Sequence, residues 1–111
     1  MSSFPPPPDA AGLLESLLKP LLEDFDSSFR RGLELLEICP EAVLGVEARA
    51  ELRQRLQRSQ AELQAARSLR AAAPVPMALD MGAIAPWHAL VVEVWSLSAA
   101  LRAAGILPPS P

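Results

Sequence analysis

The residues able to perform catalytic chemistry are few in this chain of 111 residues, which has one histidine, His88, one cysteine, Cys39, and no tyrosine. A cysteine nucleophile needs its histidine base within hydrogen-bond reach. Cys39 follows a predicted helix of nearly thirty residues, which would be about 40 Å long. His88 is expected beside the start of that helix, so the two side chains would lie at opposite ends. We therefore predict no catalytic residue and a protein that is not an enzyme.

The sequence also contains few residues that could form a metal or phosphate site. A structural zinc site needs four Cys, His or carboxylate ligands, whereas the acids here are dispersed. Glu23 and Asp24 are adjacent, so they point to different sides of a helix. The five glycines are scattered and form no phosphate-binding loop. These patterns predict no metal and no cofactor, and Cys39 is expected to be a small buried apolar residue.

The composition favours a helical protein. Half of the residues are hydrophobic but only 5% are aromatic, and the abundant Ala, Leu, Arg and Glu residues favour helices over strands. The net charge of −3 offers no basic surface to a nucleic acid, so no nucleic-acid partner is expected. A single cysteine and the absence of a basic start followed by an apolar run predict a cytoplasmic protein.

Apolar spacing predicts two long helices. In the first helix, from 10 to 38, Asp9 can cap the N-terminus and Pro20 is expected to introduce a kink. The second helix spans 46 to 72, after a short turn opened by Pro40 and ended by Gly45. Residues 1–40 carry three basic and seven acidic groups, and residues 41–72 carry six and four, which indicates that the two helices pack side by side. The expected apolar stripes are Leu14, Leu18, Leu21, Phe25, Phe29, Leu33 and Leu36 in the first, widened by Leu13, Leu17, Leu22 and Leu35, and Leu52, Leu56, Ser59, Leu63 and Ala66 in the second.

After a loop predicted over residues 73–85, a third helix is predicted from Pro86 to Ala104, with Gly105 as its C-terminal stop. Its segment is apolar and nearly long enough to span a bilayer, but it contains Glu93, whose burial in lipid is costly, so no transmembrane span is predicted. The helix is apolar over more than half of its circumference. It should therefore be the central helix or face a partner. Its stripe is Trp87, Leu90, Val91, Val94, Trp95, Leu97 and Leu101, and Val92 lies off it.

Together these elements predict an all-α fold, a three-helix antiparallel bundle with long first and second helices. A helical hairpin with the third helix laid across it is the alternative. The expected organisation is a disordered Pro-rich leader (1–9), a single three-helix domain (10–104) and a disordered, Pro-containing C-terminal tail (105–111).

These features favour a non-enzymatic interaction protein that binds another protein or itself through the apolar face of the third helix. Two alternatives stay open. One is an accessory factor that lies against a membrane without spanning it. The other is a tetrapyrrole or small-molecule binder with His88 as axial ligand and Trp87 stacking on the ligand. The candidate partner-binding residues are Trp87, His88, Val92, Trp95, Phe25 and Phe29.

Three segments resemble a known family. They are Leu17-Leu18-Lys19-Pro20-Leu21-Leu22-Glu23-Asp24-Phe25, the Gln- and Ala-rich centre of the second helix (59–66), and Ala85-Pro86-Trp87-His88. Together, over roughly residues 13–102, they look like a small helical family of cyanobacteria, catalogued as a domain of unknown function. The Pro-rich leader and the Ala-rich second helix depart from that pattern. The resemblance implies a cytoplasmic or thylakoid-associated setting and no particular activity.

Overall fold

The computed structural model describes residues 10–72 and 81–109, which form three helices and, within those ranges, no strand: α1 (Ala10–Ile38), α2 (Val46–Ala72) and α3 (Met81–Ala103). The predicted all-α class and the ranges of the first two helices are confirmed. The predicted Pro-rich leader, the end of the C-terminal tail and most of the predicted 73–85 loop lie outside the described residues.

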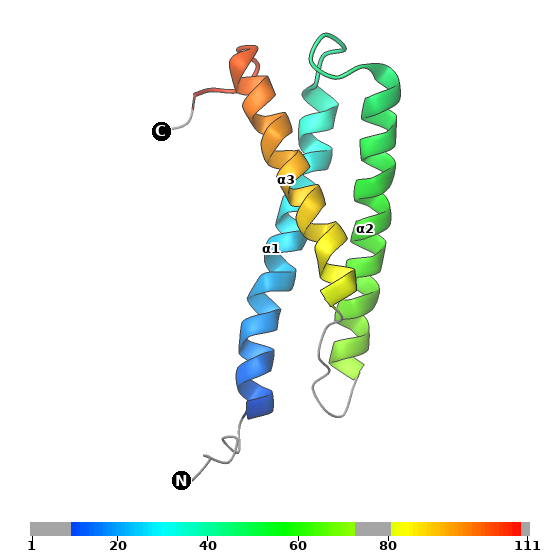
Figure 1. The fold of residues 1–111 in the computed structure, drawn as a ribbon, viewed down its shortest axis with the longest axis vertical. Helices are drawn as coiled ribbons and strands as arrows, with labels where there is room; N and C mark the ends of the chain where they lie inside the picture. Colours follow the sequence, from blue (N-terminus) through cyan, green and yellow to red (C-terminus); the bar gives the residue numbers. More distant parts are fainter. Residues whose placement is uncertain (1–9, 73–80, 110–111) are drawn as a thin grey trace.

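The first helix, α1, packs against both of the others. Figure 1 shows α2 returning alongside α1 and α3 crossing α1 at an angle, with the end of α3 drawn away from α2. This arrangement resembles the hairpin with a helix laid across it. The expectation that the third helix would be central is therefore wrong, because α1 holds that place and leaves one side of α3 uncovered.

The turn between α1 and α2 is fixed by hydrogen bonds to its backbone carbonyls. The Pro40 carbonyl accepts from the amides of Val43 (3.0 Å) and Leu44 (3.2 Å), and the Gly45 carbonyl accepts from Arg49 N–H (2.9 Å) as α2 begins. The Arg49 guanidinium donates to the Cys39 carbonyl at 3.0 Å. A cation placed at the carbonyl end of a helix stabilises that end, so the predicted short turn is confirmed and Arg49 anchors it to α1.

Prolines lie inside two of the helices. Pro20 is within α1, which continues through it. Pro86 is within α3, which begins five residues earlier than predicted, at Met81. Pro86 is the sixth residue of α3, beyond the first turn, so it removes one intrahelical backbone hydrogen bond, but Ile84 in the extra turn packs against the core. The apolar contact of Ile84 favours helix where the proline suggested a boundary.

Gly105 ends α3 as predicted. Its φ of 76° is the left-handed conformation that glycine adopts without strain. The Gly105 amide donates to the Arg102 carbonyl at 3.0 Å and the Ile106 amide donates to the Leu101 carbonyl at 2.9 Å, which is the Schellman pattern. Leu107 packs against the core, so the part of the predicted disordered tail that directly follows Gly105 is ordered.

The core lies where all three helices meet. Each predicted stripe supplies it, and Leu52, Leu56, Ser59 and Leu63 of α2 are all buried. At the centre is Gly32, where an added Cβ would lie 2.7 Å from Val94 Cγ2 and 2.9 Å from Leu56 Cδ1. Apolar side chains therefore dominate the α1–α2 contact among the described residues; an ion pair between these helices, Asp26 to Arg67, is a loose 3.9 Å, and such surface pairs contribute little.

Candidate functional site

An open groove of about 380 Å³ runs between α1 and α3. Apolar side chains from both helices line it, and the polar groups of Asp24, the two serines and His88 stand among them. Asp24 is the one acidic residue among those that line the groove. The lining residues are Leu21, Asp24, Phe25, Ser27, Ser28, His88, Val91 and Trp95.

Trp95 stands at the edge of this groove with 61% of its surface exposed, and Val92 is 42% exposed on the same side of α3. His88, Val92, Trp95 and Ala99 are spaced by three and four residues, so they share the outer face of α3. We call this row the α3 outer face. Residues 84–101 contain no Asp, Glu, Lys or Arg except Glu93. An exposed tryptophan on an uncharged helix face is characteristic of an interaction surface.

Exposed apolar surface continues from the α3 outer face onto α1. Leu17 is 65% exposed and Leu21 is 36% exposed, one helical turn apart. Leu21 was expected on the main buried stripe and is exposed, whereas Leu22, expected to widen that stripe, is buried at 1%. The position at which α3 crosses α1 decides which side of α1 is covered. The spacing of apolar residues along α1 does not by itself tell which of two adjacent leucines is buried.

Three of the six predicted partner-binding residues lie inside the core. Phe25, Phe29 and Trp87 are buried, and Phe29 is fully inaccessible. The rings of Phe25 and Phe29 stack at 6.1 Å, and Trp87 meets Phe25 edge-on at 5.7 Å. The prediction of partner contact is wrong for Phe29 and Trp87, because aromatic packing between α1 and α3 covers them, whereas Phe25, though only 5% exposed, still lines the groove. Trp87 Nε1 has no hydrogen-bond partner within the described ranges.

His88, a candidate partner-binding residue, is exposed. The predicted pairing of His88 with a stacking Trp87 is wrong, because consecutive helical residues diverge and Trp87 turns into the core. The aromatic residue that shares a groove with His88 is Trp95, two turns further along α3. Among the described residues no group of three His, Cys, Asp or Glu side chains is arranged to hold a metal ion.

Cys39 is buried at the end of α1. Its thiol lies 3.6 Å from the Pro40 carbonyl, to which it donates a weak hydrogen bond. The prediction of a small buried apolar residue is therefore confirmed for Cys39.

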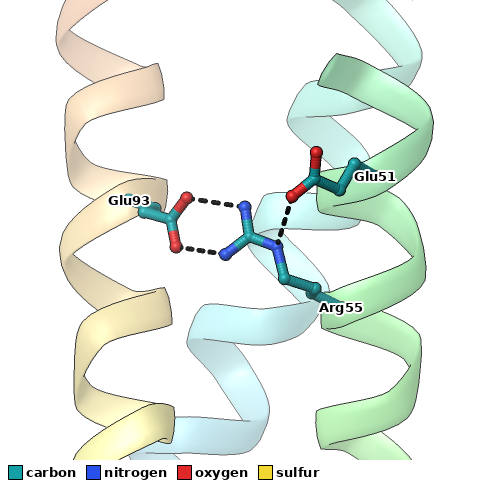
Figure 2. Close-up of polar contacts among 3 residues, drawn as sticks. All are labelled: Glu51, Arg55 and Glu93. Atoms are coloured by element: carbon teal, nitrogen blue, oxygen red, sulfur yellow. Dashed lines mark hydrogen bonds and ion pairs between the residues drawn. The ribbon is translucent and has the colours of Figure 1, made fainter. Parts of the chain in front are cut away.

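An ion pair joins α2 to α3 across the gap between them (Figure 2). The Arg55 guanidinium donates to both carboxylate oxygens of Glu93, at 2.6 and 2.8 Å, and its Nε lies 3.7 Å from Glu51. The hydrogen bond to Glu93 raises the pKa of Arg55, against a smaller opposing effect of burial. Arg55 therefore stays charged through every ordinary buffer, and the stability that this shift contributes would be lost only as pH rises above the usual arginine range.

We expect Glu93→Gln to lower the free energy of unfolding by no more than about 1 kcal/mol, because partly exposed ion pairs contribute roughly that amount or less. Both side chains are about 40% exposed. The loss should shrink as salt is added, because salt screens the pair. The measurement is urea unfolding at low and high salt.

The matched control is Glu34→Gln, since Glu34 makes only an i,i+3 pair with Arg31 at 3.6 Å. A loss for Glu93→Gln equal to that of Glu34→Gln would show that the bridge does not help to hold α3 beside α2.

The sequence contained signals that the predictions did not use, since Glu93 was weighed only against a transmembrane span and Gly32 was not considered. Glu93 is a lone acid on an apolar helix, which is a sign of a cationic partner on another helix. Gly32 interrupts a run of good helix formers, which is a sign of close helix packing. Asp24 and Ser28 carried no such signal, since their place in a groove depends on where α3 crosses α1.

The fold and surface define an all-helical, single-core protein with one helix left uncovered on its outer side. The chain belongs to the family described as "Protein of unknown function (DUF2605)", which matches residues 8–103. No curated protein and no solved structure matches the chain.

Proposed function

We propose that this chain is a non-enzymatic accessory protein, an antiparallel three-helix module that binds another protein or a second copy of itself through the α3 outer face. The observation that carries this proposal is Trp95, 61% exposed beside an apolar groove. Tryptophan is enriched among the residues that dominate interface energies, especially next to a pocket. Leaving such a side chain in water forgoes about 1.5–3 kcal/mol of burial, which a partner would recover.

The scarcity of catalytic groups supports the same proposal. Cys39 is buried, and although Asp24, two serines and His88 share the groove, no hydrogen bond or ion pair joins them in the described part of the chain. A site that offers apolar area, two serines and one acid fits recognition better than bond chemistry.

The test replaces Trp95 or Val92 by glutamate in the full chain. Both side chains are largely exposed, so circular dichroism should show an unchanged helical fold. Affinity capture from the native host, with soluble and membrane fractions kept separate, should lose its stoichiometric partner with either variant.

Leu69→Glu is the control, because Leu69 is 56% exposed on α2, outside the α1–α3 groove. Capture that is unaffected by Trp95→Glu, or equally weakened by Leu69→Glu, would overturn the proposal. If Trp95→Glu or Val92→Glu unfolds the chain, the α3 outer face belongs to the core instead.

A second candidate is a peripheral membrane factor, cytoplasmic in setting and lying against a thylakoid-type membrane. Its support is that the helix segment Ile84–Ala103 is long and apolar enough to cross a membrane, and that only 33% of this apolar stretch is buried inside the bundle. The α3 outer face lacks the Lys- and Arg-rich flank that surface-seeking helices use. Flotation with neutral and anionic liposomes tests direct lipid contact, and a chain that stays at the bottom of the gradient would remove this candidate.

A further inference from the structure

We infer that a second copy of this chain covers the α3 outer face, about a two-fold axis that places Trp95 of each copy in the α1–α3 groove of the other. This inference rests on the proposed function and names its partner. In a two-fold interface the same patch of each copy faces the other, so the patch must contain both the side chain and the surface that the side chain contacts. Trp95 is a projecting side chain and the groove beside it is a socket of about 380 Å³, and the two adjoin on one face.

The charges of this patch also suit self-association. Among the residues lining the groove, the anionic group is Asp24 and the ring N–H donor is His88. A two-fold axis through the patch can bring Asp24 of one copy toward His88 of the other, and the same pair forms twice. No excess of one sign is concentrated on the α3 outer face to repel an identical surface, because residues 84–101 contain Glu93 alone and Arg55 neutralises it.

The length of the face is compatible with a dimer interface. The 20 residues Ile84–Ala103 give a helix about 30 Å long. The adjoining side of α1, with Leu17 and Leu21, adds a second helix about 8–10 Å away. A face of two helices of that length approaches the roughly 800 Å² that each partner buries in a stable complex.

Lipid is a poorer occupant than protein. Asp24, Ser27, Ser28 and His88 line the groove, and hydrocarbon offers none of them a hydrogen-bond partner. A second copy offers an aromatic side chain to the apolar wall of the groove and polar groups to its polar lining residues.

The experiment is sedimentation equilibrium of the full chain over a range of concentrations, with liposome flotation in parallel. We expect a concentration-dependent dimer. Trp95→Glu should weaken it by about 30-fold or more, as removal of a central interface residue does. Ser28→Arg should weaken it comparably by filling the socket, while Leu69→Glu should leave it unchanged. Circular dichroism of each variant separates loss of dimer from loss of fold.

Mixing two defective variants makes the test specific. Trp95→Ala removes the projecting ring but keeps the rest of the groove lining, and Ser28→Arg fills the groove but keeps the tryptophan, so each alone should be monomeric. Their mixture can form one of the two contacts and should associate measurably more than either variant alone.

Three results would overturn the inference. They are a wild-type chain that is monomeric at every concentration, a dimer indifferent to Trp95→Glu, and a monomer that floats with liposomes. The first result leaves the proposed function standing if host capture still depends on Trp95, because the occupant is then a different protein. The proposed function fails separately, when neither self-association nor capture responds to Trp95→Glu.

Discussion

Gly32→Leu is expected to be among the most damaging single substitutions in the helical core, lowering the free energy of unfolding by about 3 kcal/mol or more, at the upper end of overpacking costs. Even a Cβ at this position would lie 2.7 Å from Val94 Cγ2 and 2.9 Å from Leu56 Cδ1. Val94 has a stiff β-branched side chain and Leu56 is fully buried, so neither has open space to enter. Urea unfolding followed by circular dichroism measures the loss.

The smaller substitution Gly32→Ala tests whether contact with Val94 causes the loss of stability. Gly32→Ala gains about 1 kcal/mol of helix propensity but meets the same two side chains, so we expect a net loss. In a Val94→Ala background the nearest obstacle is gone, and Gly32→Ala should become neutral or stabilising. The cycle of four proteins yields the coupling between Gly32 and Val94 directly.

Gly45→Ser is the control for this cycle. No atom lies within 4 Å of a Cβ at Gly45, and serine is a favoured residue at a helix start, so stability should not fall. A neutral Gly32→Ala in the wild-type background would contradict the close approach of the three helices at Gly32.

Phe29→Ala is expected to cost about 3–5 kcal/mol, the range for truncating a buried phenylalanine. Phe29 is 0% exposed and stacks on Phe25 at 6.1 Å, so its removal leaves a cavity and ends an aromatic contact. Small domains have only about 5–15 kcal/mol of stability in total. The variant should therefore unfold at a much lower urea concentration.

Val92→Ala serves as the comparison for Phe29→Ala. Val92 is 42% exposed, and surface truncations usually change stability by less than about 0.5 kcal/mol. If Phe29→Ala cost no more than Val92→Ala, the aromatic core between α1 and α3 would not be the main support of the fold.

Much of this protein could be predicted from the sequence because helices are local. Apolar residues at spacings of three and four, with Gly45 and Gly105 as boundaries, determined the ranges of α1 and α2 and the end of α3. The buried stripe of α2, from Leu52 to Leu63, followed from the same period. These features depend on contacts within a few residues along the chain, which a single sequence contains.

What only the tertiary structure decided is where α3 crosses α1. That crossing buries Phe25, Phe29 and Trp87, exposes Trp95, and shifts burial on α1 from Leu21 to Leu22. It also permits the bridge from Arg55 to Glu93 and makes Gly32 a contact point. An apolar period identifies a face of a helix but not the residue at which another helix covers it, since that depends on how the side chains of all three helices fit together.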